Sequence, residues 1–292
     1  MEYTLTNGKI TAVFRELGAE LVSLQDEAGT EYLWQGNPVY WSGQAPVLFP
    51  IVGCLREERA LAFGKPCSMK RHGIARKRTF RLLQQSGDTI RFSLRADEET
   101  LRSYPFDFEL IVSYSIQGRS LATCFEVKNY GEEPLPYVVG GHPAFNCPLA
   151  EGESFEDYYL EFSRNELAEL PLISPENGLI DVEKRVLWMN ETNILPLQHS
   201  NFYSDALVFD SLRSRAVTLK NKYNEKGLRV DFPDFGFLGV WSAANDAPFV
   251  AIEPWTGIST CSDEGDAFEA KRGMRVLNAG ETGQSAFTVT LL

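Results

Sequence analysis

The chain has 292 residues, of which 28 are basic and 40 are acidic, so its formal net charge at pH 7 is -12. An acidic chain of this kind argues against nucleic acid or an anionic membrane surface as a partner, and it favours a small neutral substrate. The length is compatible with one large all-β domain that spans residues 1–292.

The first residues, Met1–Leu5, have neither the basic nor the apolar region of a secretory signal. No later stretch approaches the roughly 20 consecutive apolar residues of a membrane span. The five cysteines are scattered and form no C-x-x-C pair, so we expect reduced thiols. Together these features predict a cytoplasmic protein.

In the first half of the chain, short apolar runs alternate with turn residues over 3–34, which predicts a β-meander. Between 41 and 55, prolines and glycines interrupt an apolar segment, so we expect an irregular loop over a sheet. Residues 97–102 predict one helical turn, which ends before Pro105. The remaining predicted strands lie at 78–86, 88–95, 106–117 and 119–129.

In the second half, frequent Pro and Asn breaks over 149–204 predict a long excursion rich in loops, with short strands near 158–163 and 166–173. Residues 263–272 predict a short helix or a loop, and a terminal strand follows. Strand patterns also occur at 206–210, 215–220, 227–231, 237–242 and 249–253. Many short strands and few helices predict an all-β fold, a large antiparallel sandwich.

The chain shows no βαβ alternation and no glycine-rich phosphate loop after a strand. It also lacks the H-x-H and H-E-x-x-H spacings of zinc sites. We therefore expect no nucleotide cofactor and no metal ion.

Glu253 lies in the apolar strand that begins at Phe249 and stops at Pro254. A carboxylate in such a strand is costly unless it is paired or used. One interpretation is a surface salt bridge at the strand end. The other is a general base in a cleft beside Trp255, whose indole would pack on the apolar face of a sugar.

The chain has only three histidines, and two of them, His72 and His142, lie beside glycines at strand ends. Imidazoles in such positions are candidate proton donors and acceptors, although a lone histidine is more often structural. Arg56, and Arg71 or Arg76, would donate to hydroxyls or a carboxylate, and Asp205 is either a turn residue or a ligand. Residue chemistry alone predicts an acid–base site built from Glu and His.

Five short motifs, taken in order and spacing over nearly the whole chain, resemble those of the aldose 1-epimerases (galactose mutarotase-like proteins), in particular their LacX-like branch. The motifs are Pro50–Gly53 leading to Arg56, His72–Arg76, Gly141–Phe145, Asp205 and Ala251–Trp255. The family usually has a longer polar loop around the second histidine, whereas Pro143 follows His142 directly. This departure suits the LacX-like branch and leaves the identity of the sugar open.

The resemblance implies a β-supersandwich that opens and closes the ring of a free aldose, a monosaccharide, without a cofactor. In the family, a glutamate matching Glu253 takes the proton of the anomeric hydroxyl, and a histidine matching His142 protonates the ring oxygen. His72 would assist at the ring oxygen. The substrate-binding residues implied are Arg56, Asp205 and Trp255.

Three alternatives remain open at the level of the sequence. A hexose-6-phosphate mutarotase needs a cationic pocket, for which Lys70, Arg71 and Arg76 are available. A sugar-binding or regulatory protein would have kept the fold and lost turnover. A glycoside hydrolase would need two carboxylates that face one bond, such as Glu253 and Asp205.

Overall fold

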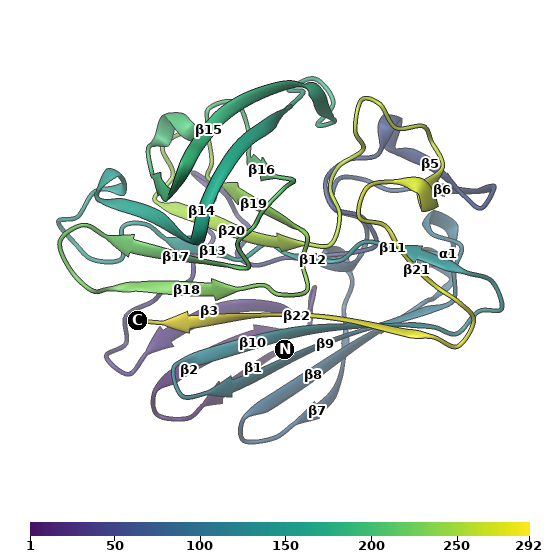
Figure 1. Cartoon of the computed structure of the whole chain (residues 1–292). Helices are drawn as coiled ribbons and strands as arrows, with labels where there is room; N and C mark the ends of the chain where they lie inside the picture. Colours follow the sequence, from purple (N-terminus) through teal and green to yellow (C-terminus); the bar gives the residue numbers. More distant parts are fainter.

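The computed structural model describes residues 1–292, and its largest element is a nine-stranded antiparallel sheet. Figure 1 shows this sheet running from the β14–β15 hairpin at the top to β7 at the bottom. Its strands, in spatial order, are β15 (Ile180–Pro196), β14 (Tyr158–Ile173), β17 (Ala216–Asn221), β18 (Gly227–Asp231), β22 (Thr282–Leu291), β10 (Ser120–Asn129), β9 (Phe108–Gln117), β8 (Thr89–Arg95) and β7 (Arg81–Gln85).

A second, six-stranded sheet packs on the first and contains β20, the strand of Glu253. Its strands are β16 (Leu207–Phe209), β19 (Phe237–Trp241), β20 (Phe249–Trp255), β12 (Gly140–Gly141) and β4 (Val47–Leu48), with β13 (Ala144–Asn146) paired to β20. The smaller elements are the meander β1 (Glu2–Thr6), β2 (Ile10–Arg15) and β3 (Glu20–Asp26), the pairs β5 (Arg59–Ala62) with β6 (Lys65–Ser68) and β11 (Leu135–Tyr137) with β21 (Arg275–Leu277), and helix α1 (Glu98–Ser103).

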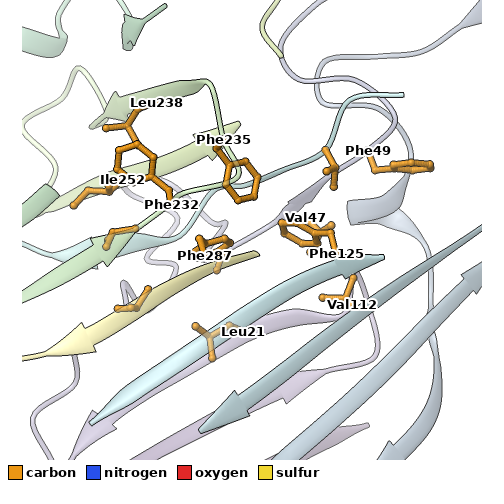
Figure 2. Packing of buried hydrophobic residues seen from close by; sticks show 14 of the residues in the cluster. Leu21, Val47, Phe49, Val112, Phe125, Phe232, Phe235, Leu238, Ile252 and Phe287 are labelled. Atoms are coloured by element: carbon orange, nitrogen blue, oxygen red, sulfur yellow. The ribbon is translucent and has the colours of Figure 1, made fainter. Parts of the chain in front are cut away.

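Aromatic and aliphatic side chains fill the space between the two large sheets (Figure 2). Phe125 on β10 and Phe287 on β22 meet Phe235, with ring centroids 6.5 and 6.1 Å from that of Phe235. All three are buried, and aromatic pairs at such distances contribute beyond the area that they remove from water. This core fixes the six-stranded sheet against the nine-stranded one.

Strand β20 has a different environment on each of its faces, because successive side chains of a strand point in opposite directions. Val250 and Ile252 belong to the main core, whereas Phe249 and Ala251 belong to a separate apolar cluster on the other face. Glu253 shares the parity of Phe249 and Ala251 and therefore points away from the main core.

The segments predicted as strands contain strands, and the predicted helical turn forms helix α1. Asp97 caps α1 by accepting the backbone N–H groups of Glu99 and Thr100, and the 41–55 segment holds only the two residues of β4 as strand. Of the alternatives for 263–272, the structure forms a loop with a single 3-10 turn at Phe268–Ala270.

The prediction of a loop-rich excursion over 149–204 was wrong. This region contains β14 and β15, strands of 16 and 17 residues that form one long hairpin. Their pairing has four register shifts, for example between Pro171 and Leu172. Each shift breaks the alternation of apolar and polar residues by which a strand is found in a sequence.

No helix of the structure combines the length and the apolar character that crossing a membrane requires.

Glu20 at the start of β3 anchors the loop of residues 34–46, which runs over the outer face of β20. Its buried carboxylate accepts the backbone N–H groups of Gln44 and Ala45 at 3.2 and 2.9 Å. The guanidinium of Arg15 pairs with the other carboxylate oxygen. The charge of Glu20 is therefore matched, and two backbone donors that would be left buried are satisfied.

Replacing Glu20 with Ala is expected to lower the free energy of unfolding by about 3 kcal/mol, because two buried N–H groups lose their acceptor. Urea unfolding measures this loss. The matched control is Glu27→Ala, which breaks the exposed ion pair with Arg119 and is expected to cost at most about 1 kcal/mol. Equal losses in the two variants would contradict the role of Glu20.

Candidate active site

A cavity of about 300 Å³ lies on the outer face of the six-stranded sheet, between this sheet, the 34–46 loop and the β14–β15 hairpin. Figure 1 shows the hairpin arching over β16, β19 and β20. The volume suits a small ligand. The lining residues are Trp41, Pro46, Val52, Gly53, Arg71, His72, Arg76, His142, Ile173, Gly178, Ile180, Asp205, Ala206, Val208, Trp241, Glu253, Trp255 and Ser259.

Glu253 reaches this cavity from the middle of the six-stranded sheet. The residue is nearly fully buried, at 1% exposure, and its Oε2 atom lies 3.3 Å from Nε2 of His142. The interpretation of Glu253 as a surface salt bridge is therefore wrong.

His142 follows β12 directly, at the point where the chain leaves the sheet. The residue is buried, and its imidazole stacks on the indole of Trp41, with ring centroids 5.0 Å apart and planes inclined by 26°. Its Nδ1 atom is buried without a hydrogen-bond partner. The orientation of the ring thus depends on packing and on the contact with Glu253.

Trp255 lies flat against the sheet because two glycines face it. A Cβ atom at Gly239 or Gly140 would lie 2.4 or 2.6 Å from the indole, closer than real Cβ contacts. Gly239 is the cross-strand partner of Glu253, and Gly140 is that of Trp255. The glycine break before His142 therefore makes room for Trp255 beside the acid–base pair.

His72 has a left-handed backbone with φ of 68°, which is uncommon for a residue other than glycine. Its Nδ1 accepts the backbone N–H of Gly53 at 3.2 Å. In the neutral ring the proton is therefore on Nε2. The ring lies edge-on to His142 with centroids 5.7 Å apart.

Asp205, Arg71 and Arg76 add charges to the cavity wall. Asp205 accepts from Arg71 at 3.2 Å and from the backbone N–H of Ala206 at 2.7 Å. Arg76 donates to the carbonyl of Arg71 at 3.0 Å, and its Nε is buried without a partner. Arg71 is thus paired, whereas Arg76 brings an uncompensated positive charge.

Arg56 and Lys70 do not line the cavity. The guanidinium of Arg56 donates to Asp266 at 2.9 Å and to the carbonyl of Glu264 at 2.8 Å. These contacts hold it on the 261–272 loop. Of the six residues predicted for the site, the structure brings together Glu253, His142, His72, Asp205 and Trp255, and it leaves out Arg56.

Burial shifts the pKa values of both members of the central pair toward their uncharged forms. Burial raises the pKa of Glu253 well above its usual range, the charge of Asp205 adds to the rise, and Arg71 and the Trp255 indole oppose it. Burial lowers the pKa of His142 to about 3, a contact of the ring with the backbone of His142 itself opposes this shift, and the positive charges of Arg76 and Arg71 add to it. The pKa of His72 is lowered mainly by burial as well.

Sequence reasoning did not identify Trp41 and Trp241, which bring aromatic rings to His142. Trp41 comes from an irregular loop, and nothing in the local pattern indicates which ring it contacts. Ser259 was also missed, and its hydroxyl donates to the carbonyl of Gly178 at 2.7 Å at the cavity wall.

The lowered pKa of His142 predicts a pH dependence of stability. Between about 3 and its ordinary value of 6.5, the unfolded chain binds a proton that the folded protein does not, so stability falls as the pH falls below 6.5. One such group changes the free energy of unfolding by at most about 1.4 kcal/mol per pH unit. Urea unfolding from pH 7.5 to 5 should therefore show the parent chain losing stability relative to His142→Asn as the pH falls below 6.5. The raised pKa of Glu253 acts in the opposite direction, and the difference between the two chains removes its effect because both carry Glu253. A stability difference that does not change with pH would contradict the lowered pKa of His142.

Comparison with known proteins identifies the family and the fold of the chain. The family model for aldose 1-epimerase matches residues 1–275. The chain is 43% identical over 298 aligned residues to the chromosomal protein LacX of Lactococcus lactis subsp. lactis, with both chains covered completely. A galactose mutarotase related enzyme from Lactobacillus acidophilus superposes with a TM-score of 0.94 at 34% identity, covering 100% of this chain and 97% of the other.

A galactose mutarotase-like protein from Lactobacillus casei superposes with a TM-score of 0.93 at 30% identity, and both chains are fully covered. The sandwich described above is therefore of the galactose mutarotase type, as the resemblance in the sequence implied. The chain belongs to the aldose 1-epimerase family.

Proposed function

We propose that the protein is an aldose 1-epimerase that interconverts the α and β anomers of a free aldose without a cofactor. The observation that carries this proposal is the 3.3 Å contact between the Glu253 carboxyl and the His142 imidazole in a buried cavity. Anomer exchange requires one group that removes a proton from the anomeric hydroxyl and one that delivers a proton to the ring oxygen. These two oxygens are bonded to the same carbon, so a base and an acid in close contact fit the task.

In the proposed reaction, Glu253 accepts the proton of the C1 hydroxyl and His142 donates a proton to the ring oxygen. The electron pair of the C1–ring oxygen bond moves to that oxygen as the bond breaks, and the C1–O1 bond becomes a carbonyl. Rotation about C1–C2 then presents the other face of the aldehyde. Reversal of the steps closes the ring as the opposite anomer and restores both groups.

The pair needs only one proton for this cycle. Its shifted pKa values favour the form in which the proton is on Glu253 and neither group is charged. Transfer of the proton across the 3.3 Å contact produces a carboxylate base and an imidazolium acid. A hydroxyl that donates to Glu253 and a ring oxygen that accepts from His142 stabilise this charged form.

The other cavity residues fit binding roles. His72, with its proton on Nε2, is a second donor beside the ring oxygen. Asp205 and Arg71 offer an acceptor and donors for sugar hydroxyls, and Trp255 offers an apolar surface. Arg56 is assigned no contact with the sugar, because its guanidinium is held by Asp266 and Glu264.

Loss of either member of the pair should abolish most of the catalysis. Glu253→Gln and His142→Asn are each expected to lower turnover by about 10²–10⁴-fold, the usual contribution of a positioned acid or base. Because both groups serve one transition state, the double variant should fall well short of the product of the single effects. Polarimetry of freshly dissolved α-glucose and α-galactose, corrected for spontaneous mutarotation, measures these rates.

Circular dichroism provides the control for folding in this experiment. Folded single variants that keep rates near those of the parent would remove Glu253 and His142 from the mechanism. A parent chain that binds aldoses but does not speed their mutarotation would favour a sugar-binding protein of the same fold. Addition of a strong chelator is expected to leave the parent rate unchanged, and a loss that zinc restores would contradict the cofactor-free mechanism.

A hexose-6-phosphate mutarotase is the second candidate, and the two arginines of the cavity favour it. Asp205 neutralises Arg71, however, so that Arg76 alone is free to pair with a phosphate. A phosphate dianion usually recruits several charged donors.

We therefore expect the neutral aldose to be the better substrate, with kcat/KM at least about tenfold higher than for the 6-phosphate, a difference of 1.4 kcal/mol. Matched polarimetric assays of glucose and glucose 6-phosphate measure the ratio. The control variant is Arg76→Gln, which should weaken use of the phosphate ester and spare the neutral sugar. A large preference for the ester that Arg76→Gln removes would instead establish the second candidate.

A glycoside hydrolase is disfavoured because Asp205 already has partners in the structure. Its carboxylate accepts from Arg71 at 3.2 Å and from the N–H of Ala206 at 2.7 Å, so it is not free to serve as the second catalytic carboxyl. The absence of new reducing ends from oligosaccharides, under conditions in which aldoses mutarotate, distinguishes the two reactions.

A further inference from the structure

Aromatic rings enclose the His142 imidazole on three sides. Trp41 stacks on its face at 5.0 Å and 26°, Trp241 lies edge-on at 5.6 Å and 78°, and His72 lies edge-on at 5.7 Å and 87°. On the remaining side, Oε2 of Glu253 lies 3.3 Å from Nε2 of the imidazole. Nothing in the mechanism above uses Trp41.

We propose that Trp41 is a positioning residue for the acid of this site: its indole fixes the rotation of the His142 ring and stabilises the imidazolium formed during ring opening. The proposal rests on the proposed function, because it takes His142 to be the proton donor. It adds a residue from the 34–46 loop to the pair formed by Glu253 on β20 and His142 directly after β12.

The need for such a residue follows from the missing hydrogen bond at Nδ1. A catalytic histidine is usually oriented by a carboxylate or a carbonyl that accepts from its second nitrogen. In this protein Nδ1 of His142 is buried without a partner. Stacking on the flat indole is then the contact that resists rotation of the imidazole about its Cβ–Cγ bond.

The charges around His142 determine how well an imidazolium is stabilised in the cavity. Arg76 and Arg71 disfavour the imidazolium, and Glu253 is the one carboxyl in contact with it. Asp205 lies across the cavity in its ion pair with Arg71, and His72 is held neutral by burial. A cation over the face of a Trp is stabilised by the ring, most when it is shielded from water. Trp41 is in place to provide this stabilisation.

The 34–46 loop is built to hold Trp41 in place without a ligand. The backbone N–H of Trp41 donates to the carbonyl of Asn37, and the carbonyl of Trp41 accepts the indole N–H of Trp34 at 2.8 Å. Elsewhere in the loop, Asn245 donates to the carbonyl of Val39 at 2.9 Å. The indole also packs against Trp241 and Phe249, with centroids 5.3 and 5.7 Å away. Trp41 is therefore fixed before the substrate binds.

The test compares Trp41→Phe, which keeps a flat aromatic face, with Trp41→Leu and Trp41→Met, which keep an apolar side chain without one. We expect the Leu and Met variants to lose about tenfold in kcat with KM within about threefold of the parent, and the Phe variant to stay within about threefold in both. Polarimetry on a sugar that the parent turns over gives both constants, and circular dichroism identifies the folded variants.

Nitrogen-15 NMR of labelled histidine gives a readout that does not depend on turnover. With three histidines in the chain, His72→Asn, His142→Asn and His199→Asn assign every imidazole signal. The parent and Trp41→Phe should show distinct, sharp Nδ1 and Nε2 signals for His142. In Trp41→Leu these signals should broaden or average as the ring samples other orientations.

The possible outcomes separate the two proposals. An unchanged kcat and unchanged His142 signals in folded Trp41→Leu would overturn the role of Trp41, and so would a Phe variant as impaired as the Leu variant. A loss confined to KM would show a substrate contact in place of positioning. If the parent turned over no aldose, the proposed function would fail, and the NMR comparison would still decide whether Trp41 orients His142.

Discussion

The burial of Glu253 beside His142 is the constraint on which the rest of the site depends. Two titratable groups in contact at 3.3 Å, nearly out of reach of water, must either remain uncharged or exchange a proton with each other. In an aqueous cleft the same residues would titrate independently. Burial of the two groups in contact with each other thus turns an ordinary carboxyl and an ordinary imidazole into a coupled pair.

Burying such a pair lowers the free energy of unfolding, and burial of the large apolar core offsets this loss. Two buried nitrogen atoms without hydrogen-bond partners lie at the cavity: Nδ1 of His142 and the indole nitrogen of Trp255. Each unmade hydrogen bond costs about 1–3 kcal/mol. The aromatic packing between the sheets, with Phe125, Phe235 and Phe287 at its centre, does not involve the cavity and can support this strain. Binding energy from a substrate that satisfies these atoms then serves catalysis.

The residues of the site come partly from a paired strand and partly from irregular loops. Strand β20, in the middle of the six-stranded sheet, holds Glu253 by hydrogen bonds on both sides, whereas His72 and Trp41 come from loops held by side-chain contacts. Gly140 and Gly239 let Trp255 lie against the sheet, and Glu20 ties the 34–46 loop to the meander. Similarity to the LacX protein and to the lactobacillar structures extends over the whole chain, so the fold that carries these residues is that of the family.

The sequence by itself determined the all-β class, most strands, the helical turn and five of the residues that meet in the cavity. The strands and the turn rest on local signals such as period-two alternation, and the site residues rest on glycine breaks, a carboxylate in an apolar strand and the resemblance to the family. Tertiary structure decided the rest. The register shifts of β14 and β15 hid a hairpin that closes the cavity, the stacking of Trp41 on His142 joins residues about a hundred positions apart, and Asp266 and Glu264 hold Arg56 outside the cavity. Contacts of this kind depend on the packing of distant segments, which no local pattern of residues records.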